Sequence, residues 1–170
     1  MGSGKTTIGK QLAKNLNLQF VDLDLFIENR YRKSISTIFK EKGEEGFREI
    51  ERKALQEVAG FEDVIISTGG GLPCFFNNIH LMNQTGTTIY LKVSVEELTK
   101  RLNVCKHNRP LISDKTLEEL KDFIELNLNK REEFYNKASL VFDAEGLTTK
   151  EDINTIVNRL ASYLTKETIV

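Results

Sequence analysis

The sequence has little of several residue types. It contains no tryptophan and only two residues each of cysteine, histidine, proline and methionine among 170 residues. Cys74 and Cys105 lie far apart in the chain and form no metal-binding spacing, so we expect no zinc site. We expect both cysteines to be reduced thiols in a cytoplasmic protein.

The chain also lacks a net charge of either sign. It has 24 Lys and Arg against 25 Asp and Glu, a formal net charge of -1. This balance argues against nucleic acid or a membrane surface as a general partner. No apolar run approaches the length of a membrane span, and we expect no signal peptide. We therefore expect a single domain over residues 1–170 that acts as a monomer on a small molecule.

Short apolar runs alternate with helical patterns along the chain. The apolar runs predict strands over residues 19–23, 63–68, 87–93 and 138–144. Periodic apolar positions predict helices over residues 6–16, 26–31, 36–42, 44–59, 95–103, 117–137 and 150–164. Consecutive apolar residues in the second run, DVIIST, predict a strand buried on both faces. The alternation predicts an α/β fold with a parallel sheet, whose ligands bind beyond the carboxyl ends of the strands.

The first seven residues, MGSGKTT, match the end of a phosphate-binding loop, G-x-x-x-x-G-K-[ST]. In that loop Lys5 reaches the β- and γ-phosphates and the hydroxyl of Thr6 binds Mg²⁺. The alternatives are an N-myristoylation signal with Gly2 as acceptor, and a cloning scar that begins with MGS. The amphipathic helix that follows favours the phosphate loop, because a helix N-terminus attracts anions.

Two further motifs follow predicted strands. Asp22 and Asp24 end the first strand, and their spacing predicts that they lie on the same side of it. They are either part of a solvated loop, or one faces magnesium and the other a substrate hydroxyl. Gly69, Gly70 and Gly71 follow the second strand, and three consecutive glycines favour close approach of a ligand over a simple turn.

Three arginines are candidate anion-binding groups. Arg48 and Glu51 are three residues apart on a predicted helix and can pair, although an exposed surface pair is the alternative. Arg109 lies in an irregular segment over about residues 103–115, which we interpret as a lid. It is a candidate for stabilising charge on a transferring phosphoryl group. Arg131 lies on a long predicted helix, where the alternative is ordinary helix surface.

Taken together, the ordered motifs resemble the shikimate kinase family over essentially the whole chain. They are GSGKTT, DLD, ISTIFKEKGEEGFREIE, ISTGGG, RP in the predicted lid, and REEFYNKA. The resemblance implies a P-loop NTPase fold of the nucleoside-monophosphate-kinase type, with parallel strand order 2-3-1-4-5. It implies phosphorylation of the 3-hydroxyl of shikimate by ATP with Mg²⁺, a step in aromatic amino-acid biosynthesis.

The resemblance also implies residue roles. Catalysis would use Lys5, Asp24 and Arg109, with Asp24 binding the shikimate hydroxyls and accepting the proton. ATP would contact Gly2, Ser3, Gly4, Lys5, Thr6, Thr7, Arg101 and Arg109, and Mg²⁺ would be held by Thr6 and, through water, Asp22. Shikimate would contact Asp24, Phe39, Phe47, Arg48, Gly69, Gly70, Gly71 and Arg131, mostly from helices over about residues 25–60. Two arginines suit this substrate because guanidinium groups fork onto carboxylates; Glu51 would steady Arg48.

The sequence departs from the family pattern in two places. The segment DAEGLTTKED lacks the basic residue often found near adenine. The first glycine of the phosphate loop and the strand before it are also missing, and we interpret Met1 as an internal methionine chosen as the start. We therefore expect a gap in mid-sheet between residues 63–68 and 87–93, or collapse of these strands onto each other, or a partner chain between them.

Three alternative functions remain open. One is a kinase of the same architecture that acts on another small polyol such as gluconate. The second is a truncated fragment that binds ATP but has little or no activity, and the third is association with a membrane through myristoylation of Gly2.

Overall fold

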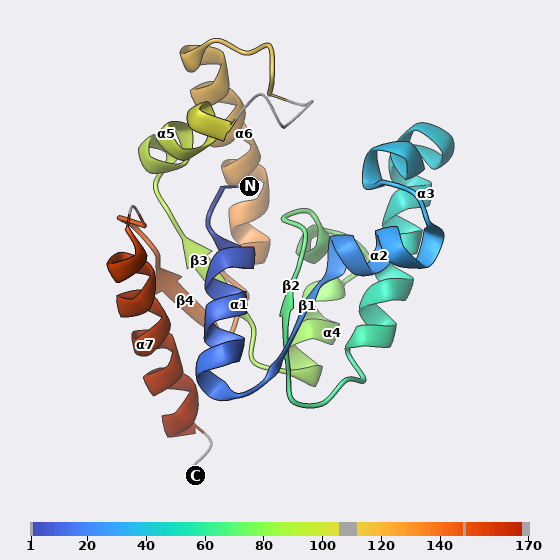
Figure 1. The fold of residues 1–170 in the computed structure, drawn as a ribbon. Helices are drawn as coiled ribbons and strands as arrows, with labels where there is room; N and C mark the ends of the chain where they lie inside the picture. The colour runs from blue at the N-terminus through green and yellow to red at the C-terminus, as the bar shows by residue number, and fades with distance from the viewer. Residues whose placement is uncertain (1, 106–111, 148, 168–170) are drawn as a thin grey trace.

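The chain folds into alternating helices and strands, as predicted (Figure 1). The computed structural model describes residues 2–105, 112–147 and 149–167. The helices are α1 (Lys5–Leu16), α2 (Leu23–Tyr31), α3 (Ile35–Val58), α4 (Asn78–Thr85), α5 (Val95–Cys105), α6 (Leu117–Tyr135) and α7 (Lys150–Glu167). The strands are β1 (Gln19–Asp22), β2 (Val64–Ser67), β3 (Ile89–Lys92) and β4 (Leu140–Asp143), and a 3-10 helix, η1, covers Leu72–Cys74.

The described strands form two separate parallel pairs. β1 pairs with β2, and β3 pairs with β4. These correspond to the 2-3 and 4-5 pairs of the expected 2-3-1-4-5 order, so these two pairings are confirmed. Of the three outcomes expected for the middle of the sheet, the described residues show the gap: β2 and β3 belong to different sheets.

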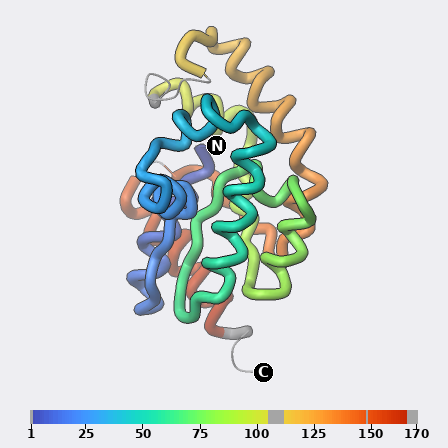
Figure 2. Tube along the Cα trace, turned by 90° about the vertical axis from the view of Figure 1, so that its right-hand side faces the viewer, coloured from blue at the N-terminus to red at the C-terminus, as the bar shows by residue number. Residues whose placement is uncertain are grey.

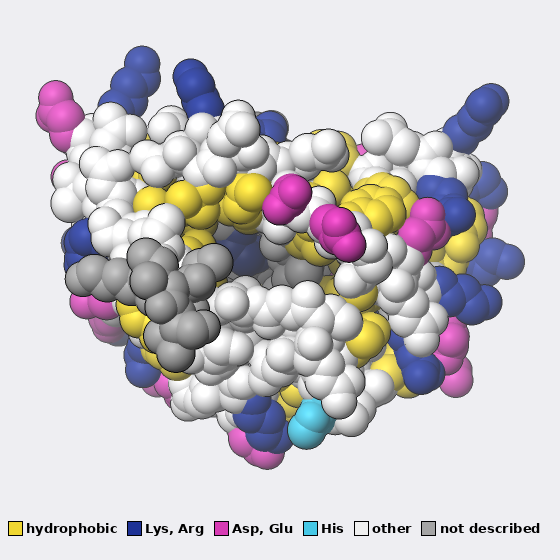
Figure 3. All heavy atoms as spheres, turned by 90° about the horizontal axis from the view of Figure 1, so that it is seen from below, with side chains coloured by type: hydrophobic (Ala, Val, Ile, Leu, Met, Phe, Trp, Pro, Cys, Tyr) yellow, Lys and Arg dark blue, Asp and Glu magenta, His cyan; other side chains and the backbone are white. Residues whose placement is uncertain are grey.

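A cavity of about 690 Å³ begins at the phosphate loop and continues along this gap. Its walls include Ser67 at the end of β2, Ile89 and Leu91 of β3, and Met82 of α4. Seen from the end opposite the phosphate loop, the molecule is hollowed near its centre, with hydrophobic side chains along part of the rim (Figure 3). The cavity therefore extends between the two pairs of strands.

The exposure of β2 reflects the gap. Only Ser67 of this strand is buried, whereas Val64, Ile65 and Ile66 are partly exposed. The prediction that this run is buried on both faces is therefore wrong. The apolar side chains have the pattern of an interior strand, but one edge of β2 has no strand beside it among the described residues.

Helix α1 connects the two halves of the molecule. Its side chains Ile8 and Leu12 lie in a core formed with α5, α6, α7, β3 and β4. A side chain at Gly9 would lie 2.7 Å from the ring of Phe20, so α1 also lies directly against β1. A second core lies mainly among α2, α3 and η1. Figure 2 shows α3 running along the side of the molecule that this second core occupies, beside α4.

Helix boundaries differ from the predictions where side chains cap them. α2 begins at Leu23 because the Asp22 carboxylate accepts hydrogen bonds from the backbone N–H groups of Asp24 and Leu25. α3 is interrupted at Gly43, whose φ of 69° and ψ of -177° are not helical, so the two helices predicted here are present as two arms of one element. α4 and η1 were not predicted. None of the described helices is long and apolar enough to cross a membrane.

Candidate active site

The phosphate loop leads directly into α1. Gly2 and Gly4 have φ values of 77° and 84°, a conformation that favours glycine. Lys5 begins the helix, and its Nζ lies 3.5 Å from the Ser3 hydroxyl. The first turn of α1 contains no acidic residue. The helix N-terminus therefore keeps its partial positive charge for an anion.

Thr6 and Asp22 bring two oxygen atoms together beside this loop. The Thr6 hydroxyl donates a 3.0 Å hydrogen bond to Oδ2 of Asp22. Hydroxyl and carboxylate oxygens are donors that Mg²⁺ prefers. The expectation that Asp22 and Asp24 share one strand is wrong, because β1 ends at Asp22 and Asp24 lies in the first turn of α2.

Asp24 is a carboxylate with a perturbed acidity. Burial raises its pKa, the neighbouring charge of Asp22 raises it further, and the positive charges of Lys5 and Arg48 oppose the shift. The Asp24 and Glu51 carboxylates both approach Gly69, where an added Cβ would lie 3.4 Å and 3.0 Å from them. A group with this environment, beside a phosphate loop, is a candidate proton acceptor.

Arg48 forms an ion pair inside the protein. Its Nη1 donates a 2.9 Å hydrogen bond to Glu51, whose side chain is only 2 % exposed, and its Nη2 lies 3.2 Å from the exposed Glu44. The alternative of a surface pair is therefore wrong. The Nε of Arg48 is buried and has no hydrogen-bond partner within the described residues. A buried donor of this kind is costly unless a ligand uses it.

Aromatic rings surround the same guanidinium group. The Arg48 Cζ lies 5.9, 5.3 and 4.3 Å from the ring centroids of Phe39, Phe47 and Phe75. Phe39 and Phe47 stack on each other at 4.3 Å. No sequence pattern indicated Phe75, which follows the glycine motif in the stretch LPCFF. The rings hold the arginine in place and give the pocket an apolar wall.

Gly69, Gly70 and Gly71 allow other groups to approach the backbone closely, and none of them has a positive φ. A Cβ at Gly71 would lie 2.8 Å from Nη2 of Arg48. The described glycines with positive φ are Gly2, Gly4, Gly43 and Gly146, so none of the three motif glycines needs a left-handed backbone. The segment 69–71 therefore passes directly under Arg48, where a side chain would not fit.

Arg131 faces the same region from α6. Burial raises the pKa of Glu51, and the charges of Arg48 and Arg131 both oppose that shift. The same two arginines oppose the increase that burial causes in the pKa of Cys74. Two guanidinium groups from different helices therefore act on one place, as a clamp for a small carboxylate requires.

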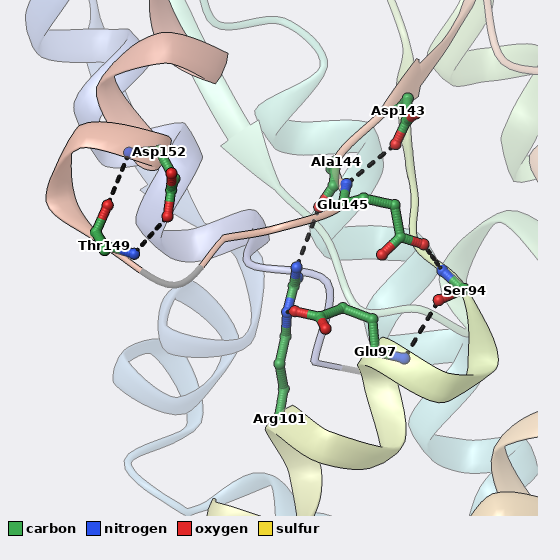
Figure 4. A network of polar contacts seen from close by, with 8 residues as sticks. All are labelled: Ser94, Glu97, Arg101, Asp143, Ala144, Glu145, Thr149 and Asp152. Atoms are coloured by element: carbon green, nitrogen blue, oxygen red, sulfur yellow. Dashed lines mark hydrogen bonds and ion pairs between the residues drawn. The ribbon is translucent and has the colours of Figure 1, made fainter.

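Arg101 comes from α5 and lines the same cavity as the phosphate loop; its contacts are shown in Figure 4. Its Nε pairs with Glu97 at 2.8 Å and its Nη2 donates to the Ala144 carbonyl at 3.2 Å. The backbone N–H of Ser94 donates to Glu145, so α5 and the segment after β4 are joined by two contacts. The Nη1 of Arg101 is buried without a partner among the described residues.

Comparison with known proteins identifies the family. The sequence model described as "Shikimate kinase" matches residues 1–161. The chain belongs to the shikimate kinase family. It is 60 % identical over 164 residues to a shikimate kinase of Parabacteroides distasonis, covering 96 % of this chain and 95 % of that protein. The match spans the phosphate loop, so we read MGSGKTT as this loop rather than as a lipidation signal or a cloning scar.

Solved shikimate kinase structures share the fold. The enzyme of Bacteroides thetaiotaomicron has a TM-score of 0.94 at 48 % identity, covering 97 % of this chain and 94 % of that one. The enzyme of Acinetobacter baumannii, solved in complex with shikimate, has a TM-score of 0.85 at 29 % identity, covering 100 % of this chain and 91 % of that one. The expected P-loop NTPase fold is thereby confirmed.

The shikimate kinase fold brings the predicted residues together. Every predicted contact of ATP, Mg²⁺ and shikimate, apart from Arg109, lines the one cavity of about 690 Å³. Arg109 lies outside the described residues, as does most of the predicted lid. Two further contacts were not predicted from the sequence. Glu44 is a second partner of Arg48, and the Tyr135 hydroxyl donates to the Gly70 carbonyl.

Proposed function

We propose that this chain transfers the γ-phosphoryl group of ATP to the 3-hydroxyl of shikimate. One observation carries the proposal. A single cavity is lined by a phosphate loop, a partly buried carboxylate at Asp24, and the two arginines Arg48 and Arg131. The loop suits a nucleotide, and the arginines suit the carboxylate of a small hydroxy acid.

At the acceptor end, we propose that Arg48 and Arg131 bind the carboxylate of shikimate. The unpartnered Nε of Arg48 supports this role, because a bound anion would satisfy it. Phe39 and Phe47 would pack against the ring of the substrate. The glycine segment 69–71 would leave the space that the substrate needs beneath the arginines.

At the donor end, we propose that residues 2–7 hold the phosphates of ATP. Lys5 would bind the β- and γ-phosphates, and Arg101 would lie beside the adenine. Mg²⁺ fits Thr6 and Asp22, whose oxygen atoms already meet at 3.0 Å. When bound, Mg²⁺ would neutralise charge on the phosphates.

In the proposed transfer, Asp24 accepts the proton of the 3-hydroxyl. The hydroxyl oxygen bonds to the γ-phosphorus while the bond from that phosphorus to the bridging oxygen of ADP breaks. The raised pKa of Asp24 supports this role, because a more basic carboxylate accepts a proton more readily. The remaining residues act by positioning and by stabilising charge, which is the main requirement of phosphoryl transfer.

ADP release measured with MgATP and either shikimate or gluconate tests the proposal. We expect turnover with shikimate and much less with gluconate. Turnover of gluconate at an equal rate would overturn the choice of acceptor. Binding of ATP without turnover of either acid would overturn the proposed activity and favour the inactive-fragment alternative.

We further propose that the chain works as a monomer in the cytoplasm. All groups proposed for the site come from one chain, so no second copy is needed to complete it. Light scattering of the purified protein, with and without ligands, tests the oligomeric state.

A further inference from the structure

Tyr135 lies at the end of α6, against the glycine segment. Its hydroxyl donates a 2.6 Å hydrogen bond to the carbonyl oxygen of Gly70, 65 residues earlier in the chain. The positive charge of Arg131 acts on the same hydroxyl and opposes the rise that burial causes in the pKa of Tyr135. Arg131 and Tyr135 are four residues apart and therefore lie on one face of the helix. One oxygen atom thus joins two parts of the cavity wall that come from distant parts of the sequence.

We infer that Tyr135 is a positioning residue for the acceptor substrate, whose hydroxyl fixes Arg131 relative to the glycine segment 69–71. The inference rests on the proposed function, since it concerns how shikimate is held. Tyr135 would not touch the reacting atoms. It would act through Arg131 on the substrate carboxylate and through Gly70 on the backbone beneath it.

The Tyr135 hydroxyl acts as the donor in its hydrogen bond with Gly70. A phenol has one O–H to donate, and here Gly70 takes it. The oxygen lone pairs then remain available to a donor, and the guanidinium group of Arg131 can only donate. Burial raises the pKa of Tyr135, so the hydroxyl keeps its proton at neutral pH and the donor to Gly70 is retained.

The ring of Tyr135 is held independently of its hydroxyl. It packs against the ring of Tyr90 on β3 with the centroids 4.9 Å apart. The substitution Tyr135→Phe therefore removes the bridge while keeping this contact. Tyr90→Phe is a matched control, because it removes a hydroxyl from the other ring of the same pair.

Steady-state kinetics and thermal unfolding of the full chain test the inference. Loss of the hydroxyl that holds Gly70 beside the charged Arg131 leads us to expect that Tyr135→Phe raises KM for shikimate about tenfold. In Tyr135→Phe we expect kcat, KM for ATP and the melting temperature to stay close to the values of the parent. In Tyr90→Phe we expect these three quantities and KM for shikimate to be unchanged. An unchanged KM for shikimate would overturn the inference, as would an equal effect of Tyr90→Phe. A Tyr135→Phe chain that unfolds, or loses melting temperature alone, would assign the residue to stability and overturn it too.

Hydrogen exchange without substrate separates this inference from the proposed function. We expect faster exchange over residues 68–72 in Tyr135→Phe and no change in Tyr90→Phe, because the bridge exists without ligand. A parent that does not phosphorylate shikimate, combined with this exchange difference, would overturn the function while leaving the bridge in place. A parent that is active, with neither exchange nor KM altered by Tyr135→Phe, would overturn the inference alone.

Discussion

Arg48 and Glu51 form an ion pair that is almost fully buried, so we expect substitution of Arg48 to have a large effect. Removing one member leaves the other buried and unpaired, and truncations of this kind cost about 2–5 kcal/mol in binding. We therefore expect Arg48→Ala to weaken shikimate binding by that amount, with little change for ATP. Calorimetric titration of each ligand measures both effects.

Glu44→Gln is the control for this prediction. Glu44 also pairs with Arg48, but its side chain is 64 % exposed, and exposed pairs contribute at most about 1 kcal/mol. We expect it to bind shikimate nearly as the parent does. If Arg48→Ala kept the affinity of the parent for shikimate, the clamp assigned to Arg48 would be wrong.

Asp24→Asn keeps the shape of the side chain and removes the proton acceptor. Because a positioned general base contributes about 10²–10⁴-fold in rate, we expect kcat to fall within that range while ATP affinity stays similar. Single-turnover measurements at saturating shikimate and ATP separate this effect from binding. A rate equal to that of the parent would exclude Asp24 as the acceptor.

The acidity of Asp24 also predicts a pH dependence. Burial first, and then the charges of Asp22 and Glu28, raise its pKa above the usual 3.8, so activity should be lost on the acid side at a pH above that value. Glu28→Gln removes one of these charges and keeps an oxygen that can accept from the Ile35 N–H, as Glu28 does at 2.8 Å. We expect the acid limb of kcat/KM to move to lower pH in this variant, with the rate at high pH unchanged. A limb that stays in place would contradict the prediction.

The ionisation of Asp24 should affect the stability of the folded chain in the opposite direction to its effect on activity. A carboxyl whose pKa is raised by folding contributes stability that is fully present below its unfolded pKa and is lost as the pH rises through its folded pKa. The ionised Asp24 that the reaction needs therefore weakens the folded state at neutral pH. Asp24→Asn should unfold at a temperature equal to or above that of the parent at pH 7, and the difference should shrink in acid.

At the scale of elements, the interruption of α3 at Gly43 has a predictable cost. Its φ of 69° and ψ of -177° lie in a region that is essentially restricted to glycine. Apart from the neighbouring backbone of the helix, the described residues place no heavy atom within 4 Å of a Cβ added there, so the cost of Gly43→Ala comes from the backbone alone. We expect a loss of about 1–3 kcal/mol in the free energy of unfolding, measured in denaturant.

Gly86→Ala is the matched control, since a Cβ there also meets nothing within 4 Å. Its φ of -178° is ordinary extended backbone. Alanine at such a position lowers the entropy of the unfolded chain, so we expect no loss of stability. Equal destabilisation by both substitutions would show that the Gly43 backbone is not the cause.

Sequence patterns predicted the elements that depend on local apolar periodicity. The four strands and most helices lie where the apolar runs placed them, because burial of a face decides these elements. The start of α2 was missed because it depends on a side-chain cap by Asp22, which the strand pattern concealed. α4 was missed because it is short and only Asn78 and Ile79 are buried in it.

Within the site, sequence reasoning found the residues whose chemistry is visible in one motif. It missed Phe75 and the Tyr135 hydroxyl, because their importance comes from contacts with distant residues that no local spacing shows. The partial burial of β2 was also unpredictable from its own residues. It depends on what lies beside the strand in the folded chain.

At the scale of the whole molecule, the gap between β2 and β3 should limit stability. Backbone groups at strand edges need partners, and each buried group left without one costs about 1–3 kcal/mol. We expect that about ten apolar residues ending in Gly-x, fused ahead of Met1, raise the melting temperature by roughly 10 °C. We also expect faster phosphorylation of shikimate, because a strand between β2 and β3 would fix the walls of the cavity relative to each other. Calorimetry and the ADP assay measure the two effects.

A fusion of equal length with proline at alternate positions is the control, because proline cannot donate to a ladder. We expect it to melt as the unextended chain does. If the apolar fusion gave no gain over this control in either assay, the gap would not be a site for a strand.

The cavity between the two pairs of strands also suggests that the chain could serve as one component of a sensor for peptides that bind there. An apolar peptide supplied separately would have to insert between β2 and β3, and its binding would be measured as faster release of ADP. The sensitivity of such a sensor would be set by how strongly the peptide pairs with both strand edges. α1 already lies against both pairs of strands, so it would hold them in their relative positions before the peptide binds.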